Sequence, residues 1–551
     1  MKYKMNVLNV NRTIECKNGA RIEEVLNEVS SELPYPVFLA KYDNAYRSLT
    51  HKIHHDGVLE FLDLRNQEAW LVYQTSLVLL FIKAVHDVLG NKVLVNVKNA
   101  LNKGIFITIT HRLNEEILGD IRNRMRELVD ADVPIRKEHM TKDGAQKLAI
   151  KMKQMETFDM LHNITNIDDI EIYSLQDETQ IFYNSIVPST GYLQLFDLRL
   201  FRNGLILQYP HPSDPGSIPE YEEQNQMYDA FSEATRWGQL TEINYVNELN
   251  RKIIFDELDD VFLMQEALHE KKISDIADMI KERKSRVVLI CGPSSSGKTT
   301  FAKRLCIQLR VNGFKTLYMG TDDYYKEFSE RVYDENGEPD LESIRAIDTD
   351  LFARNINDLL DGKTVDLPHF DFGKKGKVYG QRITKLENNQ LIVIEGIHAM
   401  NDKLLENINE KEEFKIYISP FTPLAIDHHN RISATDARML RRLVRDFKFR
   451  NCDAQETIRT WPKVRTSEDV NIFPYISKAD IFFNSNCLYE LAVLKKYAEP
   501  LLKRVSRNEP EYGEAQRMLS FLKYFDCIYD ESRIPNNSIL REFVGGSVIV
   551  K

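Results

Sequence analysis

Residues 287–300 read VVLICGPSSSGKTT, and this stretch decides the fold of the chain around it. Val287–Cys291 is a short apolar run typical of a buried strand, and residues 300–309 are typical of the beginning of a helix. Between them lies the pattern G-x-x-x-x-G-K-[ST], in the strand–loop–helix context that it requires. Gly292 and Gly297 permit backbone conformations that turn successive N–H groups toward phosphate oxygens, and the helix N-terminus adds unpaired donors. An ordinary glycine- and serine-rich turn is the alternative, but the context favours a nucleoside triphosphate site.

The end of this loop carries a cation and a hydroxyl group. Lys298 can neutralise the β- and γ-phosphates of a nucleotide, and the Thr299 hydroxyl can ligate Mg²⁺. We therefore expect ATP and Mg²⁺ as cofactors. The residues expected to contact the nucleotide are Gly292, Pro293, Ser294, Ser295, Ser296, Gly297, Lys298, Thr299 and Thr300.

The composition narrows the class of protein. The chain has 551 residues, 43% hydrophobic and 28% charged, so a globular protein of roughly two to four domains is expected. Its formal net charge of −10 argues against a protein that coats nucleic acid nonspecifically. Six cysteines without C-x-x-C spacing indicate a reducing compartment. No apolar signal region opens the chain, and the apolar run at 70–82 is too short to span a bilayer, so a cytoplasmic protein without membrane contact is expected.

From residue 286 onward, apolar runs alternate with helical segments. This alternation predicts a parallel sheet covered by helices on both faces. Ligands of such a sheet bind at the carboxyl ends of its strands. The predicted strands are Val287–Cys291, Lys315–Gly320, Gln390–Glu395, 414–419 and 479–484.

Carboxylates follow two of these strands. Asp322, in the segment TDDYY after the second strand, is placed to accept the proton of an attacking hydroxyl group and to orient that group toward a γ-phosphate. Glu395 ends the third strand and can hold Mg²⁺ directly or through water. The structural alternatives are a solvated loop acid for Asp322 and a helix cap for Glu395.

Four arginines are spaced for one face of a helix. Arg438, Arg441, Arg442 and Arg445 stand at i, i+3, i+4 and i+7. Planar guanidinium groups suit a phosphoryl group in transfer. A solvated charged face is the usual alternative for such a run, but the phosphate loop upstream favours a role at the phosphates.

These motifs resemble those of the uridine kinase/phosphoribulokinase family of P-loop kinases, over residues 286–500. The glycine-rich loop is similar to that family's Walker A loop, and residues 322–325, DDYY, are similar to its D-x-[FY]-Y motif. Residues 340–348 are similar to its acid-rich segment, and residues 368–372, PHFDF, resemble the hairpin that lines its base pocket. The glutamate–glycine pair after the third strand and the arginine-rich helix complete the resemblance.

The resemblance also implies roles for single residues. It implies Asp322 as the general base, with Lys298, Thr299 and Glu395 on Mg-ATP and with Arg438 and Arg442 on substrate or phosphate. The residues that it implies near a nucleoside are Tyr325, Asp340, Phe370 and Phe372, together with Arg438. His369-Phe370 and Lys375 depart from the family's base pocket, so the resemblance does not extend to a preference for uridine or cytidine.

The front half resembles a different group of proteins. Residues 1–65 predict a β-grasp module and look like a TGS domain, and the triplet His51, His54 and His55 is interpreted as a solvated turn rather than a metal site. Residues 68–240 look like the second additional, editing-type domain of threonyl-tRNA synthetase. That fold uses an H-x-x-x-H pair, but residues 73–77 here read YQTSL, so no hydrolytic metal site is expected.

The expected fold class is α/β, with a P-loop kinase domain preceded by a β-grasp module and an α+β editing-like domain. The expected domains are a TGS-like module (1–65), an editing-like domain (66–245), a helical connector (246–284), the kinase domain (285–505) and a C-terminal extension (506–551). For residues 536–551 the sequence leaves two alternatives open, a strand packed back on the protein and a loose end.

The function predicted first is ATP-dependent phosphorylation of the 5′-hydroxyl of a ribonucleoside. The alternative among enzymes is a phosphoribulokinase-like or other small-sugar kinase. The aromatic residues Tyr324, Tyr325, Phe370 and Phe372 favour a substrate with a base that can stack, and therefore a nucleoside. The alternative of another class is an RNA-associated regulatory protein switched by ATP, with weak RNA or tRNA contact through the N-terminal modules. Related kinases often associate, so the sequence leaves homo-oligomer formation open.

Overall fold

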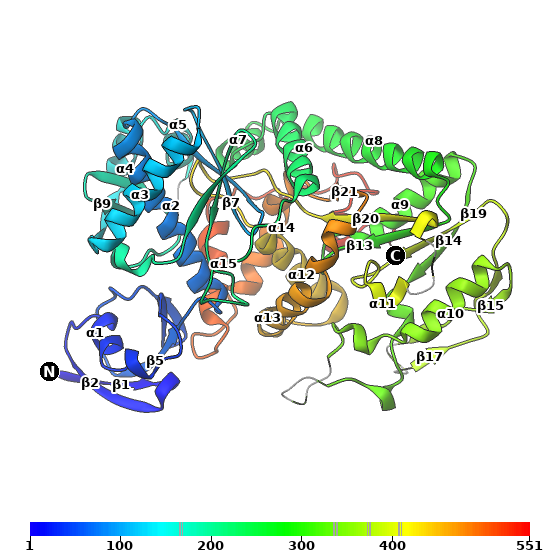
Figure 1. Ribbon diagram of the computed structural model, residues 1–551, viewed down its shortest axis with the longest axis horizontal. Helices are drawn as coiled ribbons and strands as arrows, with labels where there is room; N and C mark the ends of the chain where they lie inside the picture. Colours follow the sequence, from blue (N-terminus) through cyan, green and yellow to red (C-terminus); the bar gives the residue numbers. More distant parts are fainter. Residues whose placement is uncertain are drawn as a thin grey trace.

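Figure 1 shows the computed structural model of the chain, which describes residues 1–550 except 165–166, 168, 334–336, 338–339, 372, 374–375, 406–407 and 409. The N-terminal strands and their short helix form a lobe at the lower left of this view, and the next helices and strands lie above it. The rear sheet and its helices fill the other side. The long helix α8 (Asp259–Arg283) runs along the upper edge.

The first lobe is a sheet covered by one α-helix. Its elements are β1 (Lys2–Val7), β2 (Arg12–Lys17), α1 (Ile22–Asn27), β3 (Leu39–Tyr42), β4 (Ala45–Arg47) and β5 (Gly57–Leu62). The strand order is β2-β1-β5-β3-β4, and β1 runs parallel to β5. Val7, Ile22 and Leu59 are fully buried in its core. Two strands, a helix and further strands follow one another as the sequence predicts, whereas the resemblance to a TGS domain stays a prediction.

The second region combines helices with two antiparallel sheets. Its helices are α2 (Gln67–Leu89), α3 (Glu115–Asp130), α4 (Lys142–Lys151), α5 (Met155–Asn163) and α6 (Asn225–Thr241). Its strands are β6 (Val95–Leu101), β7 (Gly104–Ile109), β8 (Ile135–Thr141), β9 (Asp169–Leu175), β10 (Glu178–Ile181), β11 (Asp197–Phe201) and β12 (Gly204–Gln208). The sheets have the orders β11-β12-β7-β6 and β10-β9-β8. The resemblance of this region to an editing domain, and the RNA contact expected from it, stay predictions.

Helix α2 is the core helix of this region. It is long and apolar enough to cross a membrane by length and composition, but 78% of its most apolar window is buried inside the protein. Such burial is typical of a core helix. The helix is longer than the apolar run at 70–82, so the expectation that this segment is too short to span a bilayer does not hold for the whole helix.

Two details of this region differ from the sequence predictions. The pattern over 142–155 predicts one helix, but α4 ends at Lys151 and α5 begins at Met155. Lys153 has a φ of 60°, a left-handed conformation that interrupts a right-handed helix. Strand β8 has no counterpart among the predictions, because only Ile135 of its seven residues is buried and no apolar alternation marks it.

The rear sheet consists of parallel strands, as predicted. It is formed by β13 (Val287–Cys291), β14 (Lys315–Gly320), β19 (Gln390–Glu395), β20 (Glu413–Ser419) and β21 (Ile481–Asn484), in the order β14-β19-β13-β20-β21. All of its pairings are parallel. The first three strands begin and end at the predicted residues. The α/β class of this part of the chain is therefore confirmed.

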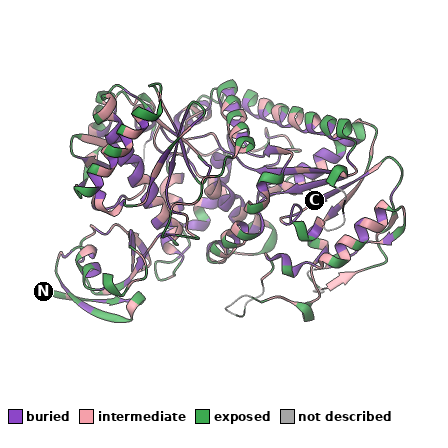
Figure 2. Cartoon of the chain, in the orientation of Figure 1, coloured by how far each residue is buried: buried purple, intermediate pink, exposed green. Residues whose placement is uncertain are grey.

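Both faces of β13 are covered. Val287 and Leu289 pack in one cluster with Phe352, from α10 (Thr349–Leu360). Val288 and Ile290 pack in another cluster with side chains of α8 and of α9 (Lys298–Val311). Figure 2 shows this central strand as buried throughout. A strand covered on both faces has no polar alternation, which explains its continuous apolar run.

The predicted connector, residues 246–284, is part of the packed structure. It contains α7 (Val246–Ile254) and α8. Ile273, Ala277 and Ile280 of α8 lie in the cluster that covers β13, and α7 buries Val246. Helix α8 therefore belongs to the layer that covers the rear sheet.

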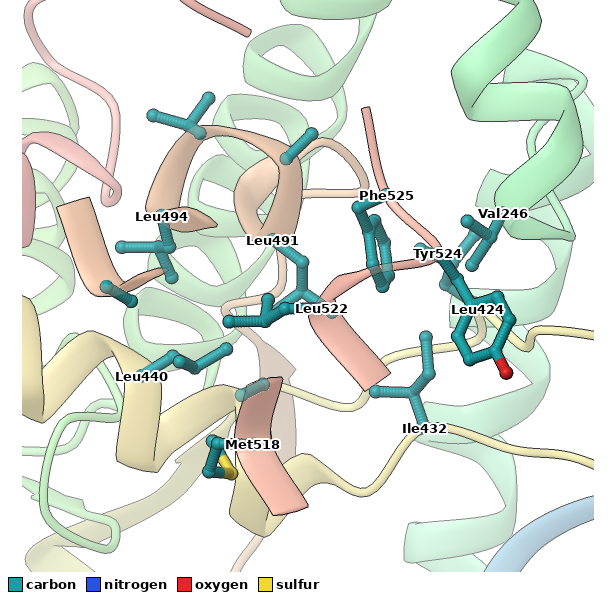
Figure 3. Close-up of a cluster of buried hydrophobic side chains, with 14 of the residues drawn as sticks. Val246, Leu424, Ile432, Leu440, Leu491, Leu494, Met518, Leu522, Tyr524 and Phe525 are labelled. Atoms are coloured by element: carbon teal, nitrogen blue, oxygen red, sulfur yellow. The ribbon is translucent and has the colours of Figure 1, made fainter. Parts of the chain in front are cut away.

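One cluster of buried side chains joins the second region to the rear half. It receives side chains from α7 and also from α12 (Ala434–Arg450), α14 (Glu490–Leu502) and α15 (Tyr512–Leu522), which Figure 3 shows meeting at one place. Met160 of α5 belongs to the same cluster. We call this cluster the shared core.

The C-terminal residues pack back onto the rear half. They contain the short helix α16 (Arg541–Val544), and Ile539 and Phe543 are fully buried in the cluster that covers β13. The sequence leaves open a packed strand or a loose end here. Up to residue 550 the structure shows neither, because these residues pack back without forming a strand. We call residues 538–545 the C-terminal segment.

A buried ion cluster links α2, α12 and α15. The guanidinium group of Arg517 lies 3.2 Å from Glu68, 2.7 Å from Asp436 and 2.6 Å from Glu514. The Arg517 side chain is 9% exposed. One cation therefore holds carboxylates from the front and rear halves together.

We expect Arg517→Ala to destabilise the protein by about 3–5 kcal/mol, because it leaves buried carboxylates without their cation. A urea titration followed by circular dichroism measures the change. Arg504→Ala removes an exposed arginine nearby and serves as the control. Equal unfolding midpoints for Arg517→Ala and the unchanged protein would show that the ion cluster does not hold the halves together.

Candidate active site

The phosphate loop, residues 292–297, connects β13 to α9. Gly297 is the N-cap of α9 and has a φ of 85°. A side chain at Gly292 would place its Cβ 2.2 Å from the carbonyl oxygen of Ile418. Both positions therefore require glycine. Lys298 begins α9, and its Nζ donates to the carbonyl oxygen of Pro293 at 3.1 Å.

Helix α12 holds this loop through its arginines. Arg438 donates to the carbonyl oxygen of Ser294, and Arg442 donates to the hydroxyl of the same serine, both at 3.1 Å. Arg441 donates to the carbonyl oxygen of Ser295 at 3.3 Å and is fully buried. The helix face predicted from the arginine spacing therefore lies against the phosphate loop.

Arg438 is buried beneath the loop. Its guanidinium contacts both carboxylate oxygens of Glu468, at 2.5 and 2.8 Å, and only 2% of the residue is exposed. Glu468, on α13 (Ala454–Asn471), also accepts from the N–H of Ser294 at 3.2 Å. The resemblance implies Arg438 on substrate or phosphate, whereas this geometry gives it the role of bracing Ser294. Glu468 lies in no motif, so sequence reasoning missed it.

Glu395 lies with two hydroxyl groups at the carboxyl end of β19. Thr299 and Tyr318 donate to the same carboxylate oxygen, Oε1, at 3.0 and 2.9 Å. Hydroxyl and carboxylate oxygens are ligands that Mg²⁺ prefers. Thr299 and Glu395 therefore fit the predicted metal-holding role. Tyr318, which orients Glu395, has no sequence signal of its own.

Asp322 and Lys298 influence each other electrostatically. The Asp322 residue is exposed at the surface, but the protein groups around its carboxylate restrict its hydration. This loss of hydration is the first cause that raises its pKa, the charges of Glu342 and Asp323 add to the rise, and Lys298 opposes it. Burial also raises the pKa of Glu395, with Lys298 opposing the rise and Asp322 adding to it. These groups follow β13, β14 and β19, so they share the rim of the sheet on which ligands of parallel sheets bind.

Gly396 allows Asp322 to approach the end of β19. A Cβ at position 396 would lie 1.8 Å from Oγ1 of Thr321. Any other residue there would push Thr321 away, and Asp322 with it. This close approach is a physical reason for the glutamate–glycine pair.

Two of the residues expected near a nucleoside form an aromatic pair. The rings of Tyr325 and Phe370 are edge to face, with centroids 5.7 Å apart and planes at 68°. Phe370 belongs to β16 (His369–Asp371), one strand of a short hairpin. Phe372 and Lys375 lie outside the described residues.

The residues between Asp322 and Tyr325 have structural contacts. Asp323 lies 2.9 Å from His369 and 2.7 Å from Arg382, so it ties its loop to the hairpin. Tyr324 is buried against Phe352, with ring centroids 5.0 Å apart. Tyr324 is therefore a core residue, and the expectation that it helps to stack a base is wrong.

Two further carboxylates approach the aromatic pair. The pKa of Tyr325 is raised, first by burial and then by the charges of Asp322, Glu342 and Asp340. The Tyr325 hydroxyl donates to the carbonyl oxygen of Leu341 at 3.0 Å, so the acid-rich segment that contains Asp340 and Glu342 passes beside Tyr325. Glu342 lies 3.9 Å from Arg442. It stands in the acid-rich segment, but no fixed motif position distinguishes it, and sequence reasoning missed it.

Comparison with known proteins gives a family match for the rear half of the chain. Residues 287–490 match the Phosphoribulokinase / Uridine kinase family. A uridine kinase of Ligilactobacillus salivarius (strain UCC118) is 28% identical over 178 residues, which are 32% of this chain and 74% of that protein. A uridine kinase of Staphylococcus aureus (strain JH9) is 30% identical over 196 residues, which are 35% of this chain and 85% of that protein. A solved structure described as a "Possible Uridine Kinase" from Bacillus stearothermophilus is 18% identical, with a TM-score of 0.28, and the match covers 39% of this chain and 98% of that one.

Glu395→Gln should weaken the binding of Mg²⁺–nucleotide by roughly 10–100-fold, because it removes the charge that favours the metal. Binding of the nucleotide in EDTA should stay unchanged. Titrations of a fluorescent ATP analogue with Mg²⁺ and with EDTA measure both quantities. Glu387→Gln, at an exposed acid paired with Lys315, is the control. An equal loss with and without Mg²⁺ would rule out a metal-specific role for Glu395.

Proposed function

Because the chain belongs to the phosphoribulokinase and uridine kinase family, whose members are phosphotransferases, we propose that it transfers the γ-phosphoryl group of ATP to the 5′-hydroxyl of a ribonucleoside. The products are the nucleoside monophosphate and ADP. One observation carries the proposal. Asp322 is linked to both sides of the site: the charge of Lys298 lowers the pKa of Asp322, and the charge of Asp322 raises the pKa of Tyr325 in the aromatic pair.

Asp322 is the general base of the proposed reaction. Its carboxylate accepts the proton of the 5′-hydroxyl while the hydroxyl oxygen bonds to the γ-phosphorus. The bond from that phosphorus to the β–γ bridging oxygen breaks, and ADP leaves. A raised pKa makes this carboxylate a stronger base than an ordinary aspartate, which favours proton transfer near neutral pH.

The phosphate side of the reaction requires charge neutralisation. Lys298 supplies a positive charge at the β- and γ-phosphates. Thr299 and Glu395 would hold Mg²⁺, which neutralises the β- and γ-phosphate oxygens when bound. We assign Arg442 of α12 to the substrate phosphates. Its guanidinium lies between the Ser294 hydroxyl and Glu342.

The acceptor side favours a nucleoside. Tyr325 is partly exposed and can offer its ring to a planar base, and the buried Phe370 packs edge to face against that ring and holds it in place. Asp340 and Glu342, which lie near Tyr325, can accept hydrogen bonds from ribose hydroxyl groups. A small sugar phosphate would use the carboxylates poorly, because they would repel its own phosphate.

The direct test is an acceptor panel for the purified full chain with ATP and Mg²⁺. It should include ribonucleosides, deoxyribonucleosides, small sugars and sugar phosphates, with ADP release measured for each. We expect release with at least one ribonucleoside, and a monophosphate carrying its phosphate on the 5′ oxygen. Release with sugars alone would replace the proposal by a small-sugar kinase. No release with any acceptor would overturn it.

We expect Asp322→Asn to reduce phosphoryl transfer by roughly 10²–10⁴-fold, because the amide cannot accept the proton. ATP binding should stay nearly unchanged. Single-turnover transfer and nucleotide titration separate these effects. Asp350→Asn, at an exposed acid in the first turn of α10, is the matched control. Transfer by Asp322→Asn at the normal rate would show that another group is the base.

A further inference from the structure

A carboxylate from the C-terminal segment contacts donors of the nucleotide site. Oε2 of Glu542 accepts from the N–H of Thr300 at 3.2 Å and from the Thr300 hydroxyl at 2.7 Å. Thr300 lies in the first turn of α9, where N–H groups have no partner within the helix. In a loop of this sequence pattern such groups bind nucleotide phosphates. The Glu542 oxygen therefore has the partners that a phosphate oxygen would have.

The C-terminal segment is packed directly against the phosphate loop. Cγ2 of Ile539 would lie 2.5 Å from a Cβ placed on Gly297. Ile539 and Phe543 are buried in the same cluster as Phe301 of α9. Figure 1 accordingly places the C-terminus of the chain beside the rear sheet. This packing fixes the position of Glu542 at the helix N-terminus.

Helix α12 contacts the same segment. Lys448 donates to the carbonyl oxygen of Val544 at 2.6 Å, and the guanidinium of Arg445 lies 5.9 Å from the ring centroid of Phe543. The pKa of Arg445 is lowered to about 10, first by burial and then by the charge of Arg450, and the charge of Glu542 opposes this shift. Glu542 thus supplies negative charge to a crowded cationic region that would otherwise favour phosphate.

We propose that Glu542 is an intramolecular competitor of the nucleotide. Its carboxylate holds the Thr300 donors while the site is empty, and it must release them when nucleotide phosphates bind. The C-terminal segment thereby sets the affinity for nucleotide. The competitor role of Glu542 rests on the proposed function, because that function takes ATP as the nucleotide that binds here.

The test compares Glu542→Gln and Glu542→Ala with the unchanged full chain. The glutamine variant keeps the shape of the side chain and removes its charge, and the alanine variant removes the competing group. We expect both to bind Mg²⁺ with a fluorescent ATP analogue about tenfold more tightly, the effect of losing one charge-assisted competing hydrogen bond. Asp530→Asn is the control: it removes one negative charge at an exposed residue of the C-terminal extension (506–551), outside the C-terminal segment. It should leave the affinity for the ATP analogue unchanged.

The other outcomes separate this proposal from the proposed function. If Glu542 is only a cap of α9, both variants melt at a lower temperature and bind the analogue equally or more weakly, which overturns the competitor role. The nucleotide site itself then stands. If neither the unchanged protein nor the variants bind the analogue at millimolar concentration, the proposed function fails, and the competitor role fails with it.

Discussion

The position of helix α12 is the constraint on which the candidate active site depends. One side of this helix places Leu440, Leu443 and Val444 in the shared core, where each buried side chain contributes roughly 1.5–3 kcal/mol. The other side places Arg438 and Arg441 on carbonyl oxygens of the phosphate loop. The apolar side of α12 packs against helices from distant parts of the chain. This packing fixes the position of α12, and therefore the position at which its arginines contact the phosphate loop. The loop is therefore shaped before any nucleotide arrives.

The charges around the loop fall into two groups with different environments. Behind the loop, Arg438 and Arg441 are buried and paired with Glu468 and Glu490, so these charges are compensated inside the protein. On the rim, acids gather around Lys298, and the pKa values of Asp322 and Glu395 are raised above their usual range. Perturbed acids near a phosphate-binding lysine are typical of a catalytic site, whereas compensated pairs are typical of scaffolding.

The sequence is most informative where local pattern and burial coincide. The central strand β13 is apolar throughout because both of its faces are covered. The limits of β13, β14 and β19 could be read from the sequence, and Asp322 and Glu395 follow from their places at strand ends. The arginine spacing predicts one face of α12, but it does not predict Glu468, which pairs with that face from another helix and lies in no motif. Tyr318 and Glu542 could not be predicted for the same reason, because they reach the site from other elements and lie in no motif. Polar strands such as β8 give no apolar signal at all.

The shared core has a consequence for how such a chain can be rearranged in evolution. The rear half covers most of the length of free-standing relatives, yet its helices α12, α14 and α15 are covered here by residues such as Met160 and Val246 from the front. A recombination event that moved the rear half alone to another gene would expose these apolar helix faces to water. The two halves are thus packed as a single unit, and heating should melt them in one transition rather than in two.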